Sequence, residues 1–122
     1  MKSTSSIVGI VPVLPTADMA RDLRWYTEHT GFEVRQADDL YAVLRRDQFY
    51  FHLQWHADTE EDPLLGGSVM RIFVNDIHPI FEEFVERQTV PTDKLQLHTP
   101  WNTHEFGFYD LNNNAVFIVQ SL

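Results

Sequence analysis

Hydrophobic and polar residues follow the same order in two halves of the chain. The first half opens with a run rich in β-branched residues, which predicts a strand over residues 7–14 with prolines suited to a sheet edge. Asp18 is a good helix N-cap and Gly31 a good helix end. Apolar residues between them recur at i, i+4 and i+7 and predict one buried stripe, formed by Met19, Leu23 and Tyr26.

Three more strands are expected before the middle of the chain. One opens at residues 32–34, after the predicted helix. The next two, residues 41–45 and 49–55, are separated by Asp47-Gln48 and predict a hairpin. The acidic segment HADTEEDPLLGG, residues 56–67, ends in two glycines and has the composition of a linker.

After the linker the same order returns. Residues 68–74 predict a strand, and Asp76 is placed to cap a second helix. The apolar stripe of that helix recurs at i, i+3, i+4, i+7 and i+8 and consists of Ile77, Ile80, Phe81, Phe84 and Val85. Strands are then expected at residues 95–98, 103–109 and 115–119, with three consecutive Asn residues as the last turn.

The repeated order predicts an α+β fold built from two βαβββ modules that form a curved mixed sheet. A chain of 122 residues is one domain with room for a core. We therefore expect a single domain over residues 1–122, with module one at about 5–56, the linker at about 57–67 and module two at about 68–122. Curved sheets of this kind leave apolar surface and an open edge, so a homodimer is expected.

Composition narrows the possible partners. The formal net charge of −9 argues against nucleic acid and would favour cationic ligands. On composition alone, an acidic surface that only keeps the protein in solution is the preferred interpretation. No run of the sequence is long and apolar enough to cross a bilayer, so no membrane partner is expected. The absence of cysteine excludes disulfides and thiolate chemistry, and the opening MKSTSS is a poor signal peptide, so a cytoplasmic location is expected.

Four segments resemble one known family, the vicinal oxygen chelate superfamily of glyoxalases, extradiol dioxygenases and antibiotic resistance proteins. VPVLPTADMARDLRWYTEHTGFEV and FHLQWH are similar to the first module of its bleomycin resistance branch, and PWNTHEF and DLNNNAVFIV to the second. The chain departs from the branch at Asn102, His104, Leu111 and Asn113; Asn tolerates the left-handed backbone that Gly adopts there. The resemblance implies the paired-module fold, a dimer and the binding of a drug.

The enzymes of this superfamily hold a metal ion through the first and last strand of each module. The resemblance puts these ligand positions at Val11, His52, Val69 and Phe117. A divalent ion needs several nitrogen or oxygen donors, which Val and Phe lack. We therefore expect no metal, no other cofactor and no catalytic residue, with His52 as a polar residue of a cavity wall.

Strand periodicity then suggests which side chains line a binding cleft. If Val11 and His52 face inward, other residues of their strands do too, and aromatic walls with a few polar groups are typical of small-molecule sites. Trp101 is either a stacking surface, as the resemblance implies, or a packing residue under a loop. Glu105 is either a general base or, more in keeping with its type, the partner of a cation. The predicted ligand-binding residues are Trp101, Tyr50, His52, Gln54, Arg71, Phe73, Glu105 and Phe117.

The sequence thus leaves three functional hypotheses. The first is non-catalytic sequestration of a planar small molecule, bleomycin-like and cationic in the case that the resemblance implies, at a dimer interface. The second is a metal-dependent lyase or dioxygenase, which the residues at the four ligand positions disfavour. The third is a scaffold whose cavity is filled by its own side chains.

Overall fold

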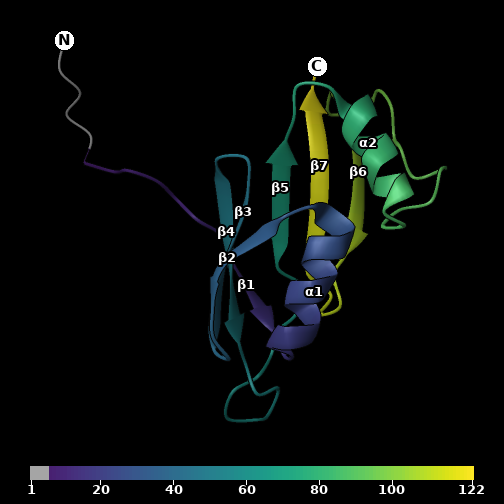
Figure 1. Cartoon of the computed structure of the whole chain (residues 1–122). Helices are drawn as coiled ribbons and strands as arrows, with labels where there is room; N and C mark the ends of the chain where they lie inside the picture. Colours follow the sequence, from purple (N-terminus) through teal and green to yellow (C-terminus); the bar gives the residue numbers. More distant parts are fainter. Residues whose placement is uncertain (1–5) are drawn as a thin grey trace.

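The structure is a computed structural model that describes residues 6–122. Within this range, two helices and seven strands follow one another (Figure 1). Their bounds are β1 Val13–Thr16, α1 Met19–Thr30, β2 Glu33–Ala37, β3 Tyr41–Arg46, β4 Phe49–Trp55, β5 Val69–Phe73, α2 Ile77–Glu86, β6 Thr103–Tyr109 and β7 Ala115–Ser121.

The strands form two sheets in which the first and last strands of each module pair in the same way. The first has the order β1-β4-β3-β2 and the second β5-β7-β6. In each sheet the strand before the helix pairs in parallel with the last strand of the module, as Val13 with His52 and Arg71 with Phe117. The remaining pairs are antiparallel. The first module therefore has the predicted βαβββ order, whereas the second has the order βαββ and lacks one predicted strand.

Two predicted strands differ from the structure. The segment at residues 95–98 forms a single bridge, between Gln96 and Glu105, because His98 adopts a left-handed φ of 52° and ends the pairing. The strand predicted at residues 7–14 begins only at Val13. In the parallel register of β1, Ile10 would lie beside Phe49, the first residue of β4, so the residues before it have no strand beside them.

Both helices begin where the sequence predicts a cap, and α1 also ends where the sequence predicts a helix end. Asp18 accepts a hydrogen bond from the Arg21 N–H, and Asp76 accepts one from the His78 N–H. Gly31 ends α1 in the left-handed conformation, with φ 73°, where a Cβ atom would also collide with the Arg87 and Arg46 side chains. These local signals therefore determine where along the chain the helices begin and where α1 ends.

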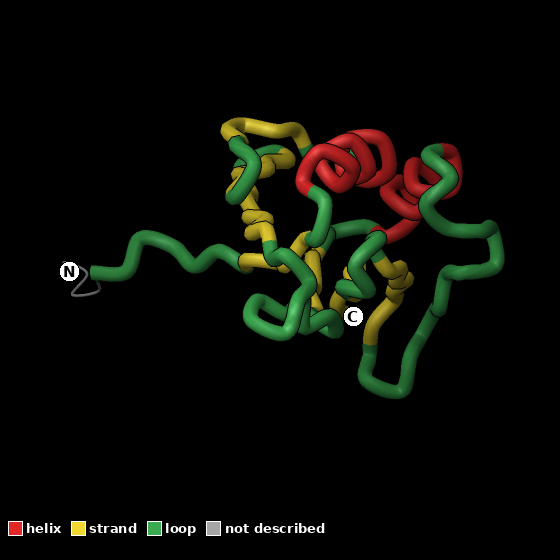
Figure 2. Tube along the Cα trace, turned by 90° about the horizontal axis from the view of Figure 1, so that it is seen from below, coloured by secondary structure: helices red, strands yellow, loops and turns green. Residues whose placement is uncertain are grey.

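One hydrophobic core joins the two modules. It combines helix-facing residues of both sheets with the buried faces of α1 and α2. Trp25 of α1 lies 6.1 Å from Phe108 of β6, and the Arg46 guanidinium lies 5.9 Å from the ring of Phe84 in α2 (distances to ring centroids). Figure 2 shows both helices on one side of the strands. The other face of each sheet is consequently left outside this shared core.

A buried polar network fastens the last turn of the chain to the first helix. Asp110 accepts hydrogen bonds from the Tyr26 hydroxyl at 2.5 Å and the Asn114 amide at 2.8 Å. Asn112 donates to Asp22 at 2.5 Å and accepts from the backbone N–H of Ala17 at 3.1 Å. Burial and the neighbouring Asp110 carboxylate raise the pKa of Tyr26, so its hydroxyl remains a donor. The DLNNN turn is thus a clamp between the modules.

Candidate functional site

The outer face of the second sheet carries a cation held between aromatic rings. The Arg71 guanidinium lies 5.5 Å from the ring centroid of Phe117 and 5.9 Å from that of Phe73. Phe117 can lie flat against β6 because its neighbour there is Gly107, where a Cβ atom would come within 2.6 Å of the ring. Period-two alternation places Arg71 and Phe117 on the same face, as predicted.

Glu105 links this cation to Trp101. Its Oε2 accepts hydrogen bonds from Thr103 Oγ1 at 2.7 Å, Trp101 Nε1 at 3.0 Å and Arg71 Nη2 at 3.2 Å. Burial alone would raise the pKa of Glu105, but the bonds from these three donors outweigh it and lower the pKa. A carboxylate engaged in this way is better suited to positioning its neighbours than to accepting a proton.

The Trp101 indole is exposed yet held in place. Its exposed fraction is 57%, whereas that of Glu105 is 4%. The supporting turn is closed by the Thr99 and Thr103 hydroxyls, 2.7 Å apart, and by Asn102 in the left-handed conformation at φ 64°. Asn therefore does accept the backbone geometry expected at the departure from Gly. The indole presents a flat face to solvent instead of packing under the loop.

The three site residues predicted in the first module lie on a different sheet. Tyr50, His52 and Gln54 alternate along β4, and His52 Nδ1 lies 2.7 Å from the Tyr41 hydroxyl. Among residues 6–122, no hydrogen bond, ion pair or ring contact joins this set to the Arg71–Trp101 set. The shared core faces the opposite side of both sheets, so a single chain does not assemble all eight residues into one cleft.

The four positions that would hold a metal ion do not provide suitable donors. Val11 lies outside the strands and Val69 begins β5, and neither side chain has a donor atom. Phe117 lies under Arg71, and His52 is engaged with Tyr41. Across the described part of the chain, no group of three or more His, Asp or Glu side chains could hold a metal ion. The donor set therefore does not fit the metal site of the superfamily's enzymes.

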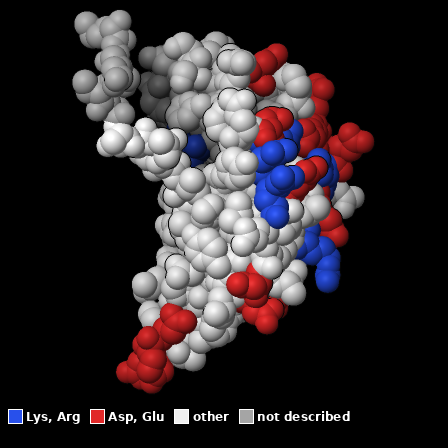
Figure 3. All heavy atoms as spheres, turned by 60° about the vertical axis from the view of Figure 1, so that its left-hand side comes forward, with Lys and Arg blue, Asp and Glu red and all other residues white. Residues whose placement is uncertain are grey.

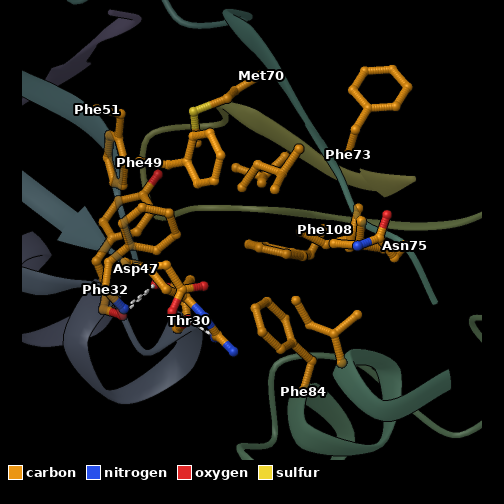
Figure 4. A pocket seen from close by; sticks show the side chains of 17 residues that line it. Thr30, Phe32, Asp47, Phe49, Phe51, Met70, Phe73, Asn75, Phe84 and Phe108 are labelled. Atoms are coloured by element: carbon orange, nitrogen blue, oxygen red, sulfur yellow. Dashed lines mark hydrogen bonds between the residues drawn. The ribbon is translucent and has the colours of Figure 1, made fainter. Parts of the chain in front are cut away.

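A cavity that no sequence pattern predicts lies between the modules. It has a volume of about 420 Å³ and lies on the helix side of both sheets. In Figure 4 the rings of Phe49 and Phe51 lie on one side of the open space, and those of Phe84 and Phe108 on the other. The alternation of apolar residues indicates that these side chains are buried, but no sequence pattern indicates how closely two modules approach. Of the eight predicted site residues, only Phe73 lines this cavity.

No helix within residues 6–122 is sufficiently long and apolar to cross a membrane.

On the side of the molecule where sheet β1–β4 lies, Figure 3 shows a broad area without charged side chains and a gathering of acidic ones at its lower end. On the N-terminal side of β1, the chain extends away from the two sheets (Figure 1). Val8 and Ile10 in this extension are 104% and 90% exposed.

Comparisons with known proteins agree with this architecture. Residues 7–118 match the family model described as Glyoxalase/Bleomycin resistance protein/Dioxygenase superfamily. A bleomycin resistance protein from Geobacillus stearothermophilus is 21% identical, over 92% of this chain and 96% of that protein. A crystal structure of a bleomycin-binding protein complexed with bleomycin has a TM-score of 0.78 at 16% identity, covering 95% of this chain and all of that one. The bleomycin-binding protein of Streptomyces verticillus, complexed with copper(II)-bleomycin, has a TM-score of 0.75 at 22% identity, covering 98% and 99% of the two chains.

Proposed function

The chain belongs to the Glyoxalase/Bleomycin resistance protein/Dioxygenase superfamily, and on this premise we propose that it sequesters a planar small molecule of the bleomycin type without transforming it. The observation that carries this proposal is the Trp101 indole, which is exposed while its N–H is held by Glu105. A large flat ring that is already ordered loses little entropy when a planar ligand stacks on it. The similar proteins named above are bleomycin resistance or bleomycin-binding proteins by their own descriptions.

The polar groups beside Trp101 suit a ligand with both a planar and a charged part. Arg71 is engaged by Glu105 through one amino group, and the pair neutralises itself. The net charge of −9 attracts a cationic portion over a longer range. Stacking on Trp101 and attraction by the acidic surface are thus two separable contributions to affinity.

We propose further that the complete cleft forms between two copies of the chain. Tyr50, His52 and Gln54 lie on the first sheet, and the Arg71–Trp101 set lies on the second. A complete cleft would therefore need the first sheet of one copy to face the second sheet of the other. The exposed apolar extension around Val8 and Ile10 supports association, because a monomer gains nothing from displaying it. Sedimentation at micromolar concentration should give about twice 14.3 kDa, and a monomer that persists at rising concentration would contradict a cleft between copies.

Calorimetric titration with bleomycin tests the proposal. Trp101→Ala should weaken binding by about 1–3 kcal/mol at both low and high salt, the usual loss for one aromatic anchor. Raising salt should weaken the wild type and Trp101→Ala by similar factors, because the screening length shortens from about 10 Å at 0.1 M to about 3 Å at 1 M. Leu40→Ala, an exposed apolar change on the first module, is the control and should leave binding unchanged.

Two results would contradict the proposal. The absence of heat and of tryptophan quenching at high micromolar bleomycin would mean that the chain keeps the fold without this ligand. Binding that survives Trp101→Ala unchanged would place the ligand elsewhere. A cytoplasmic location completes the proposal; the acidic composition is compatible with it, and cell fractionation with antibody detection tests it.

A further inference from the structure

The cavity between the modules is separate from the surface that carries Trp101. Its volume of about 420 Å³ is large enough for several water molecules. The walls would give such water few hydrogen bonds, because they are mostly aromatic rings and aliphatic side chains such as Phe49, Phe84, Phe108 and Ile118. Protein interiors are normally packed more closely than this. An apolar occupant would therefore replace poorly bonded water.

The polar atoms deep in the walls already have partners within the protein. The Tyr26 hydroxyl donates to Asp110 at 2.5 Å, and the Thr30 hydroxyl donates to the Tyr26 carbonyl at 2.6 Å. Asp47 and Asn75 also line the cavity, and neither side chain makes a hydrogen bond among the residues described. They come from different modules, at the β3–β4 turn and just after β5. The available polar groups are therefore a carboxylate on the side of the first module and an amide on the side of the second, across an otherwise apolar space (Figure 4).

We propose that this cavity is a second binding site, for a compact apolar molecule of one or two ring systems with a single hydrogen-bond donor or cationic amine. The rings would lie among Phe49, Phe84 and Phe108, and the amine would face Asp47. An anionic group is disfavoured because Arg46, the one cation in the lining, is bound by Glu83 through two bonds of 2.6 and 2.8 Å. The Arg46 charge is thereby already paired, whereas Asp47 makes no ion pair among the residues described and interacts with the Arg46 charge only through space.

A polypeptide segment suits the cavity less well. The apolar extension of a second copy could cover Phe49 at the mouth, which is 65% exposed. Deeper insertion would bury backbone N–H and C=O groups against walls whose polar atoms are already paired, which is costly. A small molecule with one polar end avoids that cost.

N-Phenyl-1-naphthylamine, a neutral aromatic amine with two ring systems that fluoresces in apolar surroundings, is a suitable probe. We expect saturable binding at one probe per chain. Ile72→Phe, which adds volume to the cavity wall, should weaken binding about tenfold or more, and Phe49→Ala about fivefold. Leu40→Ala removes an equally exposed apolar side chain outside the lining and should change affinity by less than about twofold. Thermal unfolding of each variant separates a filled cavity from a damaged fold, and Phe49→Ala at the exposed mouth should fold normally.

Competition identifies the charge that the site accepts. 1-Naphthylmethylamine, a cation, should displace the probe, and 1-naphthoate, an anion of similar size, should not; Asp47→Asn should reduce this difference. A probe that shows no saturable fluorescence, binds Ile72→Phe as well as the wild type, or is displaced better by naphthoate would overturn the proposal. Binding that tightens when Val8 and Ile10 are changed to Glu would overturn it in favour of the extension of a second copy as occupant. None of these results depends on bleomycin binding at Trp101.

Discussion

The hydrogen bond between Trp101 and Glu105 should be measurable as a coupling energy. Two changes isolate it: Trp101→Phe removes the N–H donor but keeps a flat ring, and Glu105→Ala removes the acceptor. Glu105→Ala also deprives Thr103 and Arg71 of a partner, and we expect it to lower the free energy of unfolding by about 2–3 kcal/mol. Trp101→Phe should lower it by about 1 kcal/mol.

The double variant separates the one bond from the rest. The bonds from Thr103 and Arg71 are lost whether or not the indole N–H is present, so they cancel in a double-mutant cycle. A hydrogen bond to a carboxylate contributes about 1.5–3 kcal/mol. The Trp101 N–H lies 3.0 Å from Glu105 Oε2, but the indole is 57% exposed, so water competes for it. We therefore expect a coupling of about 0.5–1.5 kcal/mol.

Urea unfolding followed by the fluorescence of Trp25 and Trp55 gives the four free energies. Protein concentration must be equal throughout, because a dimer's stability depends on it. The control cycle pairs Trp101→Phe with Tyr41→Phe, which acts on the first sheet, and should be additive within about 0.5 kcal/mol. A Trp101–Glu105 coupling below about 0.3 kcal/mol would mean that the indole is not fixed in solution, which removes the physical basis for treating it as an ordered stacking surface.

Three further outcomes follow from the same contacts. Tyr26→Phe should lower the free energy of unfolding in urea by about 1–3 kcal/mol, because the buried Asp110 loses a donor; an unchanged midpoint would contradict the buried bond. The pKa values of Glu83 and Glu105 are lowered in the folded state, so the stability that their carboxylates contribute is complete above about pH 4.5 and is lost as pH falls through the lower folded pKa values. In unfolding measurements from pH 6 to pH 3, Glu105→Gln should make the free energy of unfolding fall less steeply with pH. An unaltered slope would count against this contribution from Glu105. Elemental analysis after growth with nickel, zinc, manganese and iron should find well below one ion per chain, whereas stoichiometric metal that is lost in His52→Ala would reverse this expectation.

The sequence predicts those parts of the fold that are decided by local chemistry. The caps at Asp18 and Asp76, the left-handed end at Gly31 and the β3–β4 turn at Asp47 are each determined by one or two residues, and all four appear in the structure. Residues 7–9 have strand-like composition, but in the parallel register of β1 they lie beyond the first residue of β4, so that strand does not extend to them.

The candidate site was predictable to the extent that it depends on alternation. Arg71, Phe117 and Glu105 share a face because strand neighbours alternate and the register is parallel between β5 and β7. The bond from the Trp101 indole depends on how the Thr99–Thr103 turn closes, and the cavity depends on the spacing of two modules. Neither is encoded in a pattern of neighbouring residues, which is why the sequence analysis did not identify them.

The contacts of the DLNNN turn also determine when the first helix can complete its packing during synthesis on the ribosome. Asp22 and its partner Asn112 are 90 residues apart, which corresponds to roughly 5–18 s of translation at about 5–20 residues per second. Throughout that interval Asp22 has its early partners Thr16 and Arg21 but lacks Asn112, and Tyr26 lacks Asp110. The first helix should therefore remain open to protease on nascent chains halted before Asp110 and become resistant once the last hairpin has emerged; early resistance would show that the first module matures alone. The last hairpin to leave the ribosome thus completes the packing of the first helix.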